Sequence, residues 1–121
     1  MTDKAARIRE LNDAFRKACN PIAEARPGTA LGQVLITQGV QALPLEIRIA
    51  VFKAIPAFND FGRHNDPYGE HDFGSLEIAG HKLFWKIDYF RKGRAFQAGA
   101  ETPEDAASTD RVLTIMLAEE Y

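Results

Sequence analysis

The chain has 121 residues, close to the commonest size of a single domain, and its 45% hydrophobic and 26% charged residues are typical of a folded globular protein. The formal net charge of −2 argues against a generally basic binder of nucleic acid or anionic membrane, although a local basic patch is compatible with it. Cys19 is the single cysteine, which excludes an internal disulfide and a cysteine-cluster zinc site. Neither an apolar signal-peptide core nor a stretch of about 20 apolar residues is present. We therefore expect one domain over residues 1–121, in a reducing cytoplasm and without a membrane partner.

A helix is predicted over residues 3–19. Apolar side chains recur there at helical spacing, at Ile8, Leu11, Phe15 and Ala18. Charged residues, Arg16 among them, are assigned to the remaining surface, and Thr2 is a candidate cap. Asn20-Pro21 ends the helix, because proline disfavours helical geometry in the residue before it. The apolar stripe is narrow, so the helix is expected to lie on the outside.

The next segments predict a loop, a strand and a second helix. Residues 23–32 are rich in alanine, proline and glycine and indicate a loop. Residues 33–37 are rich in β-branched side chains and predict a strand, which residues 40–43 extend past a bulge. Pro44 suits the first turn of a helix over residues 45–55, and the many apolar side chains of that helix indicate substantial burial.

A β-hairpin is predicted over residues 73–90, with its turn at Gly80. The turn is formed either by Gly80 and His81 or by Ala79 and Gly80, and both registers give the same two faces because side chains alternate along a strand. One face carries Leu76, Ile78, Leu83, Trp85 and Ile87 and is expected to be the core face. The other carries Phe73, Ser75, Glu77, Phe84, Lys86 and Asp88.

The C-terminal part predicts a basic loop and a last helix. Residues 91–100 contain glycine and basic side chains and indicate a loop. Thr102-Pro103-Glu104-Asp105 has the cap, the proline and the acids of a helix start, and the helix is expected to run to Glu119. The fold class is therefore α+β in the order α-β-α-β-β-α. A three-stranded antiparallel sheet, built from one strand and the hairpin, would have helices packed on its apolar face.

The span 59–74 concentrates the groups that bind metals or transfer protons near neutral pH. It contains Asp60, His64, Asp66, Glu70, His71 and Asp72. Asn and Asp beside Pro and Gly are equally typical of tight turns, and Asp66-Pro67-Tyr68-Gly69 is a good β-turn without any chemistry. A structural turn is the favoured interpretation, followed by a recognition loop and then by a metal or catalytic centre.

A second candidate is the basic cluster of Arg91, Lys92 and Arg94. Phe90 and Phe96 flank it, an arrangement typical of nucleic-acid contacts with aromatic stacking. Three charges are few, so a solvated loop after a strand is the favoured interpretation of this cluster.

Four blocks of the chain resemble a known bacterial family. They are I-T-x-G-V-x-A-L-P at 36–44, N-D-F-x-x-x-N-D-P-Y-G-E-H-D-F-G at 59–74, F-W-K-I-D-Y at 84–89 and R-V-L-T-I-M-L-A-x-E-Y at 111–121. These blocks closely resemble the family catalogued as domain of unknown function 3768, with residues 33–121 as the family-like core. The resemblance implies a short bacterial protein, often encoded on plasmids and other mobile elements of proteobacteria, and assigns no catalytic residue. It directs attention to the residues inside its blocks: Asp66, Glu70, His71, Asp72, Lys86 and Asp88.

Three hypotheses for the function follow. The first is a non-catalytic interaction module without a cofactor, which acts on a protein or nucleic-acid partner, with a protein favoured, as an accessory or defence-evasion factor of a mobile element. Its binding candidates are His64, Asp66, Tyr68, Glu70, His71, Asp72, Lys86 and Asp88. The second is a metal-dependent or acid/base enzyme that uses Glu70, His71 and Asp72, in the metal form with a divalent cation. The third is nucleic-acid binding through Arg91, Lys92 and Arg94.

Overall fold

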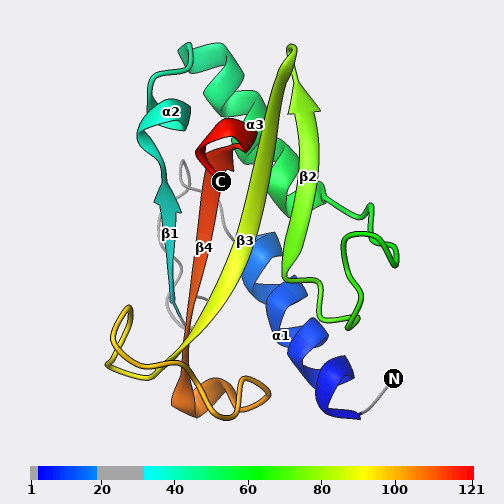
Figure 1. Cartoon of the computed structure of the whole chain (residues 1–121), viewed down its shortest axis with the longest axis vertical. Coiled ribbons are helices and arrows are strands. Elements are labelled where there is room, and N and C mark those ends of the chain that lie inside the picture. The colour runs from blue at the N-terminus through cyan, green and yellow to red at the C-terminus, as the bar shows by residue number, and fades with distance from the viewer. Residues whose placement is uncertain (1–2, 19–31) are drawn as a thin grey trace.

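Four strands form a single mixed sheet in the order β1-β4-β3-β2 (Figure 1). The computed structural model describes residues 3–18 and 32–121. Its helices are α1 (Asp3–Ala18), α2 (Gln38–Gln41) and α3 (Leu45–Ala57), with the 3₁₀ turns η1 (Ala106–Ser108) and η2 (Ala118–Glu120). Its strands are β1 (Gly32–Ile36), β2 (Phe73–Ile78), β3 (His81–Arg91) and β4 (Thr109–Leu117). Four expectations lie outside the described residues: the helix cap at Thr2, the last helical residue Cys19, the helix end at Asn20-Pro21 and most of the loop, residues 23–31.

The α+β class is confirmed, but the expected three-stranded antiparallel sheet is wrong in detail. β2 and β3 pair antiparallel, as do β3 and β4, whereas β1 pairs parallel to β4. β4 therefore lies in the middle of the sheet between the first strand and the hairpin.

The predicted C-terminal helix is wrong, because its apolar run forms β4. The residues expected to start this helix, Thr102-Pro103-Glu104-Asp105, instead form a turn that leads into η1. The Asp105 carboxylate accepts a hydrogen bond from the Ala107 amide at 3.1 Å at the start of η1. A central strand is buried on both faces and reads as a continuous apolar run, which looks like a buried helix. The β4 residues that are at most 4% exposed include Val112, Leu113, Ile115 and Met116.

The predicted extension of the first strand over residues 40–43 is also wrong. The chain turns into α2 directly after β1, and Val40 is fully buried at 0% exposure. The predicted helix over residues 45–55 is confirmed as α3, with Pro44 at its N-cap. Its burial is uneven, since Val51 and Ile55 are buried while Leu45 is 61% exposed.

The hairpin prediction is confirmed, with Ala79 and Gly80 in the turn. Ile78 pairs with His81, Leu76 with Leu83 and Gly74 with Trp85. Ala79 and Gly80 both have positive φ, 49° and 83°, which is the conformation of the two-residue turn that fits the twist of a hairpin.

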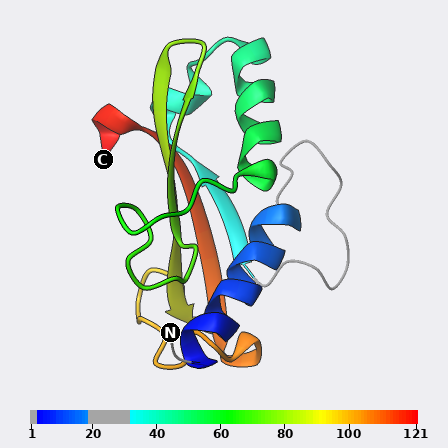
Figure 2. The ribbon, with the colours of Figure 1, turned by 90° about the vertical axis from the view of Figure 1, so that its right-hand side faces the viewer.

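The core lies between the sheet and one layer of helices. Figure 2 shows the sheet edge-on, with α1 and α3 on the same side of it. The core contains Phe15 from α1, Ile55 from α3 and Trp85 from β3, and Trp85 is fully buried as expected. Among α1 to α3, η1 and η2, only the short η2 lies on the opposite side, which faces the viewer in Figure 1, and the loop between α3 and β2 also extends to this side in Figure 2.

Candidate functional site

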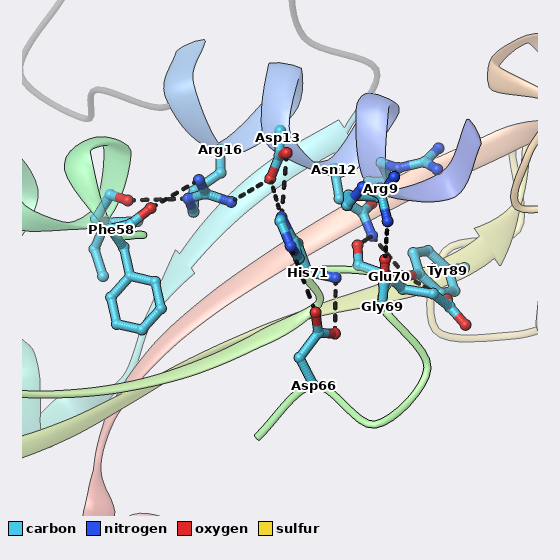
Figure 3. A network of polar contacts seen from close by, with 12 residues as sticks. Arg9, Asn12, Asp13, Arg16, Phe58, Asp66, Gly69, Glu70, His71 and Tyr89 are labelled. Atoms are coloured by element: carbon cyan, nitrogen blue, oxygen red, sulfur yellow. Dashed lines mark hydrogen bonds and ion pairs between the residues drawn. The ribbon is translucent and has the colours of Figure 1, made fainter. Parts of the chain in front are cut away.

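His71 ties the loop between α3 and β2 to α1 (Figure 3). Its Nδ1 lies 2.9 Å from Oδ1 of Asp13, and its Nε2 lies 3.5 Å from Oδ2 of Asp66. The backbone amide of His71 also donates to Asp66 Oδ1 at 3.0 Å, and the imidazole stacks on Phe61 with ring centroids 3.7 Å apart and 3° between the planes. Both ring nitrogens therefore face carboxylates of the protein itself.

Asn12, a buried residue of α1, is the centre of a second part of the network. Its side-chain amide donates to the carbonyl of Glu70 at 3.0 Å and to the Tyr89 hydroxyl at 2.7 Å, and its Oδ1 accepts from Arg111 Nε at 2.8 Å. The Tyr89 hydroxyl in turn donates to Glu70 Oε1 at 3.0 Å. Burial raises the pKa of the Tyr89 phenol far above its ordinary value, so this hydroxyl keeps its proton and acts as a donor.

Arg16 joins α1 to the C-terminal end of α3. Its guanidinium donates to the carbonyls of Ile55 at 3.2 Å and Phe58 at 3.0 Å, and to Asp13 Oδ1 at 3.0 Å. It also lies 5.3 Å from the ring centroids of Phe61 and Trp85. The assignment of Arg16 to the charged surface is therefore wrong, since the residue is only 1% exposed.

The loop over residues 59–72 has a fixed base and an exposed tip. The Asn65 side chain holds the turn by accepting from the Gly62 amide at 2.8 Å and donating to the Asp60 carbonyl at 2.7 Å. The Asp66-Pro67-Tyr68-Gly69 segment is the predicted β-turn, closed by a bond from the Gly69 amide to the Asp66 carbonyl at 3.2 Å. His64 is exposed, and Tyr68 is 77% exposed at the corner of the turn.

The predicted candidates Lys86 and Asp88 lie apart from this network. They form an ion pair at 3.1 Å on the face of the sheet opposite to Trp85 and Ile87. Among the basic candidates, Arg91 forms an ion pair with Glu101 at 2.9 Å, while Lys92 and Arg94 are exposed. The structure therefore brings Glu70 and His71 to α1, with Asp66 beside His71, whereas Lys86, Asp88 and the basic candidates lie elsewhere.

Glu70, His71 and Asp72 do not converge on one point. Glu70 turns to Tyr89, and His71 turns to Asp13 and Asp66. Within residues 3–18 and 32–121, no group of three or more His, Cys, Asp or Glu side chains has an arrangement that could hold a metal ion.

Asp72, at the end of this loop, has a raised pKa. Burial is the main cause of the rise, and the neighbouring carboxylates of Glu70, Asp66 and Asp88 add to it. The ionised form of Asp72 is therefore disfavoured in the folded protein.

Asp72→Asn is expected to raise the midpoint of thermal unfolding at pH 7, because it removes a partly desolvated charge and keeps the shape of the side chain. The raised pKa means that the folded protein holds the proton of Asp72 more tightly than the unfolded chain does. The stability that Asp72 contributes is thus present below its ordinary pKa and is lost as the pH rises through the folded-state pKa. Differential scanning calorimetry of both proteins between pH 3 and 7 should show an advantage of the variant that grows with pH. An advantage that is independent of pH would contradict this account.

The members of the network on α1 and β4 were not among the residues predicted from the sequence. Asn12 and Arg16 share the buried face of α1 with Ile8 and Phe15, at spacings of three and four residues. Polar residues in register with an apolar stripe are the signal that could have revealed them. Arg111 stands directly before the apolar run of β4 and is 2% exposed. Burial lowers the pKa of its guanidinium.

The fold and the network define a small α+β protein whose loop between α3 and β2 is held against α1 by buried polar residues. The chain belongs to a family of proteins of unknown function, DUF3768, whose model matches residues 36–120. This confirms the family resemblance, and α1 and all of β1 except Ile36 lie N-terminal to the matched residues. No curated protein and no solved structure matches the chain. In the part of the chain that the structure describes, every helix is too short or too polar to cross a membrane.

Proposed function

We propose that the protein is a non-catalytic binding module that recognises a partner protein through the tip of the loop over residues 59–72. The observation that carries this proposal is the contrast between the base and the tip of the loop. Asp66, Glu70 and His71 are held by contacts inside the molecule, while Tyr68 is 77% exposed on a proline-containing turn.

A loop of this construction is suited to binding for two reasons. Its conformation is set before the partner arrives, so less conformational entropy is lost on association. Tyrosine is enriched among the residues that contribute most to protein interfaces, since its ring supplies a large contact area with few rotatable bonds. His64, close to Tyr68 in the same loop, offers a polar contact at the rim.

The acid/base alternative has less support. A general base needs a nitrogen or oxygen within hydrogen-bond reach of the substrate. Both ring nitrogens of His71 face carboxylates of the protein, and Glu70 accepts from Tyr89. We further infer, from the family context alone, that the module serves a mobile element of a bacterium as an accessory or defence-evasion factor in the cytoplasm.

Tyr68→Ala is expected to weaken capture of the partner at least tenfold, because truncation of a central interface tyrosine commonly costs about 2 kcal/mol or more. The tagged protein and the variant would be used as baits in a lysate of a bacterium that encodes the chain. Captured proteins would be identified by mass spectrometry, and the affinity of the purified partner would be measured by calorimetry.

The matched control is Leu45→Ala, which truncates another exposed large apolar residue, at 61% exposure, at the start of α3. This control is expected to bind the partner as the unmodified protein does. Capture that is equally strong with Tyr68→Ala would contradict a role of the loop tip.

A further inference from the structure

We propose that the outer side of β3, on the face of the sheet opposite to α1 and α3, is a binding platform for single-stranded nucleic acid. Alternate residues of β3 point to this face, because Leu83, Trp85 and Ile87 point into the core. From the turn to the end of β3, the residues on this face are Lys82, Phe84, Lys86, Asp88 and Phe90. This row therefore contains two lysines, two phenylalanines and one aspartate, on the side of the sheet that faces the viewer in Figure 1.

Aromatic rings gather at both ends of this row. At one end, Phe84 lies 5.2 Å from Phe73 and 5.5 Å from Tyr121, measured between ring centroids. Tyr121 is 77% exposed although it packs on both phenylalanines. Its ring therefore lies over the end of the platform and keeps most of its surface in solvent.

At the other end, Phe90 lies 5.1 Å from Phe96, which is 60% exposed. Phe96 has a φ of 64°, a left-handed conformation that costs energy for a bulky side chain. Strain of this kind is typical of functional positions, where the surrounding structure holds it in place. Phe84 and Phe90 are six residues apart, which corresponds to about 20 Å along a strand. The platform is therefore long enough for several nucleotides.

Three cations of this region are available to contact an anionic occupant. Lys82 Nζ lies 5.8 Å from the ring centroid of Phe84, and Lys92 and Arg94 are exposed in the loop after Phe90. In the described residues, none of these three cations has a carboxylate oxygen within 4.0 Å.

Counting Glu119 and Glu120 of η2, the strands and η2 place five acids on this side of the molecule, and three of them are engaged by the protein. Glu120 accepts from the Thr37 hydroxyl and from the Gly39 and Leu117 amides. Asp88 is paired with Lys86 at 3.1 Å, and the Asp110 carboxylate accepts from the Gly93 amide at 2.9 Å. Glu77 lies opposite Lys82 in the ladder without forming an ion pair. Cations without partners, interleaved with rings, match a chain of phosphates and unpaired bases.

A single strand is the occupant that fits this surface. Its bases are free to stack on exposed rings, whereas a duplex hides the faces of its bases. The proposal differs from the protein-binding function of the loop tip, since Tyr68 and the platform are separate surfaces. It also extends the basic cluster of Arg91, Lys92 and Arg94 to residues of the sheet that the sequence did not connect with it.

The test is fluorescence anisotropy with labelled oligo-dT and oligo-U of 15 nucleotides, and with a duplex of the same length, at 50 mM salt. The single strands are expected to bind more tightly than the duplex. Phe84→Leu keeps the apolar character and removes the ring, so it is expected to weaken binding about 5- to 100-fold. Tyr121→Ala, at the exposed last residue of the chain, is expected to act in the same direction. It tests stacking without disturbing the core.

Salt dependence separates phosphate contacts from other effects. The double variant Lys92→Gln with Arg94→Gln is expected to reduce the slope of log K against log salt by about 1.4, because each phosphate contact to a single strand contributes about 0.7. Lys17→Gln with Lys53→Gln is the matched control. These two exposed lysines lie on α1 and α3, in the layer on the other side of the sheet, and should leave the slope unchanged.

Three results would overturn the platform. The first is no binding of either single strand up to on the order of 100 µM protein, the weak end of non-specific association. The second is equal binding by Phe84→Leu, Tyr121→Ala and the unmodified protein. The third is a dimer in sedimentation equilibrium that Phe84→Leu dissociates, without binding of the oligonucleotides, since this would assign the face to a second copy of the chain. Tyr68→Ala should keep oligonucleotide binding, and Phe84→Leu should keep protein capture, so the two proposals fail independently.

Discussion

Arg16→Leu is expected to reduce the free energy of unfolding by about 3 kcal/mol, the lower end of the usual effect of removing one partner from a buried ion pair, because the Asp13 side chain is 26% exposed. Arg16 is 1% exposed and neutralises Asp13, whose carboxylate also contacts His71. Its loss would leave the carbonyls of Ile55 and Phe58, at the C-terminal end of α3, without this donor. Urea denaturation followed by circular dichroism would measure the change.

The control is Arg7→Leu on the same helix. Arg7 is also paired with an acid three residues away, Glu10 at 2.9 Å, but both side chains are more than half exposed. An exposed pair of this kind contributes about 0.2–1 kcal/mol at most, so the control should unfold close to the unmodified protein. Equal destabilisation by the two variants would show that the burial of Arg16 has no energetic role.

Gly74→Ala is expected to destabilise the protein by about 3 kcal/mol, the upper part of the usual range for overpacking a core. A Cβ atom at Gly74 would lie 2.3 Å from Trp85 Nε1 and 2.7 Å from Phe58 Cζ. Trp85 is fully buried and Phe58 packs edge-on against it, so the indole has no free space into which to move aside. The midpoint and the slope of urea denaturation would separate a loss of stability from a change in compactness.

Gly99→Ala is the matched control, because a Cβ atom there would meet nothing within 4 Å. It is expected to change the stability by no more than about 0.5 kcal/mol, as is usual for surface sites. Trp85→Phe provides a second check, since the indole Nε1 has no hydrogen-bond partner to lose. The double variant Gly74→Ala with Trp85→Phe should be more stable than the sum of the single changes predicts. Additive effects would mean that the indole is not the group that excludes the methyl.

Much of the fold could be predicted from local patterns. The alternation of Leu83, Trp85 and Ile87 with polar or exposed residues gave the hairpin and its core face, because one face of β3 is buried and the other is not. The stripe through Ile8 and Phe15 gave α1 for the corresponding reason at helical spacing. Both elements have one buried side, and only such elements show a period in the sequence.

The candidate loop was found from its composition, but the direction of its side chains was not. Asp66, Glu70 and His71 were recognised as chemically interesting, and the structure turns all three toward the protein itself. Their partners Asp13 and Tyr89 lie 58 and 19 residues away from His71 and Glu70. No local pattern carries information about such distant pairs.

The sequence by itself determined the α+β class, the N-terminal helix, the hairpin and the family. Tertiary structure alone decided that residues 109–117 form the central strand. A segment buried on both faces has no amphipathic period, so only the flanking strands β1 and β3 select the extended conformation. Tertiary structure also decided that Arg16 is buried, because a guanidinium enters a core only where carbonyls, a carboxylate and aromatic rings from other elements surround it.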